Sequence, residues 1–142
     1  MKSILYVKYI HSISRLGVCF LLTASTCMKE PVYQYQNDSN QSNNSFGDTP
    51  LHIAVQNGDL VMVKQLCLDP RVNVNARNKY GISPIHYASE NGDLQIVKEL
   101  LFHQDLNVNK KNSFGKTALD IASQSGHEEV VDLLKQHGAI SG

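Results

Sequence analysis

The stretch Gly-Asp-Thr-Pro-Leu-His-Ile-Ala at residues 47–54 decides how the chain folds, because variants of it follow twice at a fixed distance. Residues 81–88 read Gly-Ile-Ser-Pro-Ile-His-Tyr-Ala, and residues 115–122 read Gly-Lys-Thr-Ala-Leu-Asp-Ile-Ala. Both intervals are 34 residues, and residues 47–80 share fifteen identities in 34 positions with residues 81–114. A fixed period of this length indicates a repeat protein in which each unit buries its apolar face against the next.

Each unit predicts two short helices. The Thr49 hydroxyl can accept a hydrogen bond from a free amide of the first helical turn, and Pro50 has the backbone angle of a first helical position. This helix is expected to stop at Gly58, where a left-handed backbone angle costs little. Asp59 can cap a second helix whose apolar residues recur three to four positions apart. The pattern predicts stacked helical hairpins with the core residues Leu51, Leu60, Val63, Leu94, Val97 and Leu100.

The repeated pattern resembles the ankyrin repeat, whose signature Thr-Pro-Leu-His-x-Ala stands unaltered at residues 49–54. The resemblance covers about residues 45–142 and implies an all-α solenoid of stacked helix-turn-helix repeats with connecting loops. The expected units are repeat 1 at residues 47–80, repeat 2 at residues 81–114 and a shortened repeat 3 at residues 115–142.

The chain departs from the family pattern in two ways. Its period is 34 residues, where the family usually has about 33, and the usual turn glycine is missing around residues 69–71 and 103–105. We therefore expect a longer and less regular turn at both places. The last unit carries Ala118 and Asp120 in place of the proline and histidine of the motif, as terminal units of such arrays often vary.

The composition and motifs argue against several functional classes. Thirteen Lys and Arg residues balance thirteen Asp and Glu residues, so no basic excess favours nucleic acid. The three cysteines lie far apart, the histidines show no His-x-x-x-His spacing, and no nucleophile or nucleotide motif occurs. The resemblance implies that His52 and His86 make hydrogen bonds within and between repeats. We predict no enzyme activity, no metal, no cofactor and no small-molecule substrate.

The N-terminal part of the chain differs from the repeats. Residues 1–29 combine a basic start, an apolar segment at residues 16–22 and small residues at 23–26, which is the order of an export signal. The alternatives are an N-terminal anchor or an amphipathic helix that packs on repeat 1. Residues 30–46 are dominated by Asn, Gln and Ser, which predicts a flexible linker. The protein is expected to be exported if residues 1–25 act as a signal and cytoplasmic otherwise, with membrane contact only through an uncleaved N-terminal segment.

The function indicated by this reading is non-enzymatic binding of a protein partner, whose identity the sequence does not give. In the family that the chain resembles, loop tips and the ends of the first helices line a concave side that contacts partners. The residues at these positions are Phe46, Asp48, Gln56, Lys79, Tyr80, Ile82, Glu90, Phe114, Lys116 and Gln124. The three aromatic residues either form a binding row or pack on the neighbouring loops. The alternative function is that of a membrane-tethered or envelope structural protein whose repeats oligomerise or act as a spacer.

Overall fold

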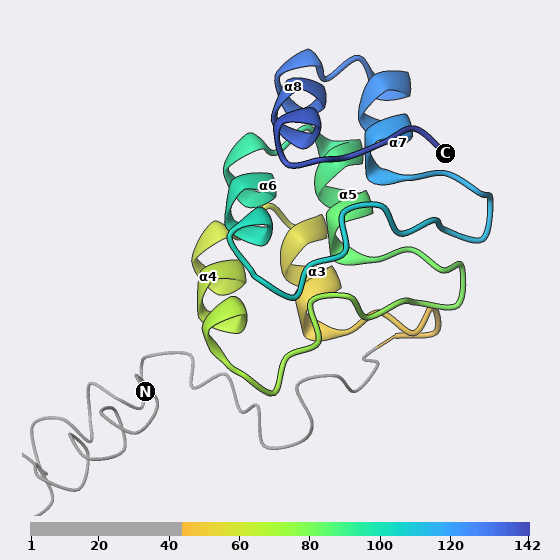
Figure 1. Ribbon diagram of the computed structural model, residues 1–142. Coiled ribbons are helices and arrows are strands. Elements are labelled where there is room, and N and C mark those ends of the chain that lie inside the picture. Colours follow the sequence, from red (N-terminus) through yellow and green to blue (C-terminus); the bar gives the residue numbers. More distant parts are fainter. Residues whose placement is uncertain (1–43) are drawn as a thin grey trace, which may run out of the picture. The chain divides into compact units, whose positions relative to one another are not determined.

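The computed structural model describes residues 44–142, and within this range it contains six α-helices and no β-strand (Figure 1). The helices are α3 (Pro50–Gln56), α4 (Leu60–Leu68), α5 (Pro84–Asn91), α6 (Leu94–Leu101), α7 (Ala118–Ser125) and α8 (Glu128–Gln136). An inner row of α3, α5 and α7 packs against an outer row of α4, α6 and α8, and long loops project from the inner row (Figure 1). This arrangement confirms the expected all-α solenoid of helical hairpins.

The predictions for the N-terminal part fall outside this description. The predicted signal or anchor at residues 1–29 lies entirely outside the described residues, and so does most of the predicted linker at residues 30–46. Within residues 44–142, no helix combines the length and the apolar character needed to cross a membrane.

The core lies between the two rows of helices, and the sequence predicted most of it. Leu51, Val63, Val97 and Leu100 are fully buried. Leu60 and Leu94 are not: they are the first residues of α4 and α6 and remain partly exposed. The residues two positions later, Met62 and Ile96, are buried in their place. The prediction for residues 60 and 94 was therefore wrong, because the second helices turn their third position, and not their first, toward the inner row.

A histidine side chain caps the start of the first inner helix and also bonds to the loop of the next repeat. The backbone N–H of Thr49 donates to His52 Nδ1 at 3.1 Å, and the Thr49 hydroxyl lies 2.8 Å from the same nitrogen. Because Nδ1 accepts the backbone N–H, the ring proton belongs to Nε2, which donates to the Ile82 carbonyl at 3.0 Å. His52 therefore joins repeat 1 to repeat 2 in its neutral form.

His86 makes the same cap with Ser83, its Nε2 bonding to a loop residue of repeat 2 itself, and an aspartate replaces the histidine in the last repeat. His86 Nδ1 accepts the Ser83 N–H at 3.1 Å, and its Nε2 donates to the Lys110 carbonyl at 3.0 Å. Asp120 takes this place in the last repeat, where its carboxylate accepts from the Thr117 N–H at 2.9 Å and from the Gly142 N–H at 3.0 Å. A carboxylate fits here because the groups within its reach are backbone N–H donors.

The turns after α4 and α6 are regular, contrary to expectation. The Val72 N–H donates to the Asp69 carbonyl at 3.0 Å, and the Leu106 N–H donates to the His103 carbonyl at 3.1 Å. Both repeats therefore close the additional residue into the same hydrogen-bonded β-turn. The expected irregularity was wrong because a four-residue turn absorbs the extra residue without the usual glycine.

Candidate functional site

The three loop tips are organised by asparagines at 34-residue intervals, namely Asn44, Asn78 and Asn112. In each loop the asparagine Oδ1 accepts two backbone N–H groups of the tip at 2.9 to 3.0 Å. Neighbouring tips are also joined, because the Lys79 N–H donates to the Phe46 carbonyl and the Ser113 N–H donates to the Tyr80 carbonyl, both at 3.0 Å. The loops therefore form a stacked and pre-ordered edge of the array.

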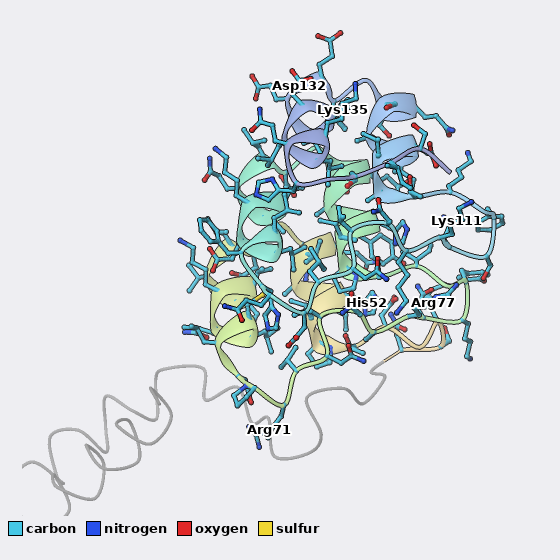
Figure 2. The ribbon with its side chains drawn as sticks, viewed as in Figure 1. His52, Arg71, Arg77, Lys111, Asp132 and Lys135 are labelled. Carbon is cyan, nitrogen blue, oxygen red and sulfur yellow. The ribbon has the colours of Figure 1, made fainter. Side chains whose placement is uncertain are left out.

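Arginine adds a side-chain link between the second and third loops. Arg77 Nε donates to the Gly81 carbonyl within its own loop, and its terminal nitrogen donates to the Lys111 carbonyl of the next loop, both at 3.1 Å. Arg77 and Lys111 lie on neighbouring loops, on the side of the inner helices that faces away from the outer row (Figure 2). A surface built on these loops has a fixed spacing from repeat to repeat.

The loop-tip aromatic residues divide into a pair and a single ring. Phe46 and Tyr80 contact each other, with ring centroids 6.1 Å apart and planes tilted by 40°. Phe114 has no such ring partner within residues 44–142 and is 69% exposed. Phe46 and Tyr80 thus share the packing role that the sequence left open, whereas Phe114 presents its ring to solvent.

A groove lies between the loops and inner helices of repeats 2 and 3, and we call it the repeat 2–3 groove. Its volume is about 240 Å³. The lining residues are Ile82, His86, Glu90, Asn112, Phe114, Lys116, Ile121, Gln124 and Ser125. This volume is below the roughly 300 to 1,000 Å³ of pockets for drug-sized ligands and is suited to a single side chain.

Five of the ten residues predicted to bind a partner come together in this groove: Ile82, Glu90, Phe114, Lys116 and Gln124. The Lys116 ammonium donates to the Gln124 side chain, and both residues line the groove. The remaining predicted residues are not part of it. Gln56 ends α3, and Phe46, Lys79 and Tyr80 occupy loop tips with exposed side chains.

Asp48 corrects the prediction for its position. Its side chain is only 1% exposed, and its carboxylate accepts from Asn44 Nδ2 and from Asn78 Nδ2, both at 2.8 Å. It therefore bridges two loops from within and offers no surface to a partner. Its place on the loop tip indicated exposure, whereas the two asparagine donors on either side hold the carboxylate inside.

The sequence reasoning missed three residues of the groove, His86, Asn112 and Ile121, whereas Ser125 lies at one of the helix ends expected to face a partner. His86 was assigned a purely structural role, and Asn112 and Ile121 were not considered as site residues. The available signal was the period itself, because residues 34 positions apart occupy equivalent places and can be compared directly. Ile121 corresponds in this way to Tyr87, a much larger side chain.

The pKa shifts of two histidines and one cysteine in the array have burial as their main cause. Burial lowers the pKa of His52 and of His86, outweighing the hydrogen bonds to backbone carbonyls that raise it. Burial, with a further contribution from Glu99, raises the pKa of the Cys67 thiol to about 11, which keeps it protonated and unreactive. Within residues 44–142, no group of three or more His, Cys, Asp or Glu side chains is placed to hold a metal ion.

The comparisons with known proteins agree with this geometry. The family model described as ankyrin repeats (3 copies) matches residues 18–112 and again residues 62–141. A search of curated proteins found no match.

Proposed function

The chain belongs to the ankyrin repeat family, whose members are generally protein–protein interaction modules, and on this premise we propose that it binds a protein partner on its concave side. The family is typically non-enzymatic, and the two motif histidines, His52 and His86, hydrogen-bond to backbone carbonyls. The observation that carries the proposal is the repeat 2–3 groove, which gathers five side chains from two loops and two inner helices.

Two further features support binding at this side. The loops are already joined by backbone hydrogen bonds, so little conformational freedom is lost when a partner settles on them. Phe114 stands at the groove as an exposed aromatic ring, and aromatic anchors often dominate the energy of interfaces. The groove also mixes apolar, acidic and basic side chains, which suits a polypeptide better than a nucleic acid backbone.

Site-specific photocrosslinking in the producing cell tests this proposal. The full chain carries p-benzoylphenylalanine in place of Phe114, and the matched control carries it in place of Phe102, an exposed ring that follows α6 in the outer row. We expect a defined crosslinked protein from position 114 and none from position 102. Crosslinking from position 102 alone would move the binding surface to the outer row and contradict the proposal.

A second candidate function is association between copies of the chain through the outer row. Leu68 and Phe102 occupy equivalent places, 34 residues apart, and both side chains are exposed. Two apolar side chains on neighbouring outer helices favour the alternative in which the repeats oligomerise or act as a spacer. Sedimentation of the wild-type chain and of Leu68→Ser/Phe102→Ser distinguishes the two candidates, because only oligomerisation through this surface is lost in the double variant.

Export remains a proposal that rests on residues 1–29 of the sequence. The basic start and the apolar segment favour cleavage after Ser25. The family match begins at residue 18, so cleavage after Ser25 removes only the first eight residues of the matched range. Mass spectrometry of the chain isolated from its source tests this, because an intact N-terminus contradicts a cleaved signal.

A further inference from the structure

The junction between repeats 1 and 2 shows what fills the space that corresponds to the groove. Tyr87 of α5 lies there, with its ring edge-on to His52 at a centroid distance of 6.0 Å and an interplanar angle of 88°. Its hydroxyl accepts from Asn78 Nδ2 at 3.1 Å and also hydrogen-bonds with the Gln56 side chain. A tyrosine of repeat 2 thus contacts a histidine, an asparagine and a glutamine of repeat 1.

The junction between repeats 2 and 3 keeps these surroundings but lacks the tyrosine. His86, Glu90 and Asn112 stand 34 residues after His52, Gln56 and Asn78, and all three line the repeat 2–3 groove. Ile121 takes the place of Tyr87 and has neither the ring nor the hydroxyl. The repeat 2–3 groove therefore corresponds to the space that the Tyr87 ring fills at the junction of repeats 1 and 2. At the second junction the smaller Ile121 leaves this space open.

The amide of Asn112 gives an independent sign that this space takes a polar group. Its Oδ1 accepts the N–H groups of Phe114 and Lys116, which fixes the orientation of the amide. The Nδ2 group makes no hydrogen bond within residues 44–142, and since Ser89 Oγ is the one buried unpaired side-chain polar atom in this range, Asn112 Nδ2 remains open to solvent. A ligand that enters the groove covers this donor and displaces water from it, so a ligand that supplies an acceptor is favoured over one that does not.

The cause of the unpaired donor is again visible one repeat earlier. Asn78 Nδ2 donates to the Asp48 carboxylate and to the Tyr87 hydroxyl. The residues at the equivalent positions around Asn112 are Ile82 and Ile121, which have no acceptor. Asn112 therefore retains the donor of the first junction without either of its acceptors.

We propose that the repeat 2–3 groove receives a tyrosine side chain of the protein partner, an inference that rests on the proposed binding function. The ring packs against His86, and the hydroxyl accepts from Asn112 Nδ2 and donates to the Glu90 carboxylate. A phenylalanine leaves the Asn112 donor unpaired, and an ionised acidic side chain has no proton to donate to the Glu90 carboxylate. The phenol hydroxyl is both acceptor and donor, so it matches both groups.

The test uses the full chain and two probes that differ by one hydroxyl, N-acetyl-tyrosinamide and N-acetyl-phenylalaninamide. Each is titrated while NMR follows the backbone amides of the groove and the side-chain amide of Asn112. We expect the tyrosine probe to shift these signals with an affinity about fivefold or more above that of the phenylalanine probe, as a net hydrogen bond gives. Equal affinity of the two probes, or shifts confined to other residues, would overturn the proposal.

Two variants make the test specific. Ile121→Tyr places the ring of the first junction in the groove and should abolish binding of the tyrosine probe. Asn112→Asp keeps the oxygen that accepts the Phe114 and Lys116 N–H groups but removes the donor, so it should weaken binding of the tyrosine probe more than binding of the phenylalanine probe. Persistent tyrosine binding in Ile121→Tyr would overturn the proposal even if Asn112→Asp fails to fold.

The outcome is separable from that of the proposed function. Photocrosslinking at residue 114 without tyrosine binding would leave the concave surface as the binding site and refute tyrosine as its ligand. Tyrosine binding without any crosslink at residue 114 would support the chemistry of the groove and count against the proposed partner surface.

Discussion

Replacing Leu100 by alanine should unfold the array far more readily than the same change at Leu68. Leu100 lies in α6 of the middle repeat and is fully buried, whereas Leu68, the last residue of α4, is 62% exposed. Leu100→Ala loses its apolar contacts and leaves a cavity, at a cost of about 2 to 5 kcal/mol. Leu68→Ala removes the same atoms from a site already in contact with water, at a cost within about 0.5 kcal/mol.

The assay is equilibrium unfolding in urea, followed by circular dichroism, for the wild-type chain and both variants. Domains of this size have total stabilities of roughly 5 to 15 kcal/mol, so the loss at Leu100 is a large share. Each repeat is stabilised by its neighbours, and weakening the middle one removes support from both sides. Equal unfolding midpoints for the two variants would refute the assignment of Leu100 to the core between the rows.

Further predictions concern pH and the aromatic loop tips. Burial keeps the pKa of His52 and of His86 below 6.5 in the folded chain, so the unfolded chain binds more protons as the pH falls below that value. Stability should therefore decrease as the pH falls through 6.5, and denaturant midpoints that stay constant on acidification through this value would contradict the neutral tautomers. Tyr80→Ala should lower the free energy of unfolding by about 0.5 to 1.5 kcal/mol through loss of the Phe46 contact. Phe114→Ala should leave stability nearly unchanged, and thermal melts that reverse this order would show that the third ring, and not the second, is the structural one.

The fold could be predicted from the sequence because its determinants are local and repeated. Thr49 with Pro50 marks a helix start, and the apolar positions that follow have helical spacing. The errors concerned the burial of Leu60 and Leu94, because the apolar spacing within a helix does not by itself determine which apolar residues face the core. Leu60 and Met62 are both apolar, and only the angle at which α4 packs against the inner row determines that Met62 is the buried one.

The candidate site was only half predictable, because a surface depends on what neighbouring repeats leave unfilled. The loop positions could be found by analogy within the repeat, yet the same position is buried as Asp48 and exposed as Lys116. Asp48 is drawn inward because Asn44 and Asn78 both donate to it, and Lys116 has no comparable acceptor pair. The period shows which residues are equivalent, whereas their exposure depends on partners one repeat away.

Tyr87 and Ile121 occupy equivalent positions in neighbouring repeats but differ in size and polarity, and this difference creates the groove. The identities between repeats establish that the two residues occupy one place in the fold. Only the structure shows that the Tyr87 hydroxyl accepts from Asn78 and that the Nδ2 donor of Asn112 has no acceptor among residues 44–142. A repeat array can therefore create a binding site by omission, because each junction inherits the hydrogen-bonding groups of the one before it. A single smaller side chain then leaves those groups to a partner.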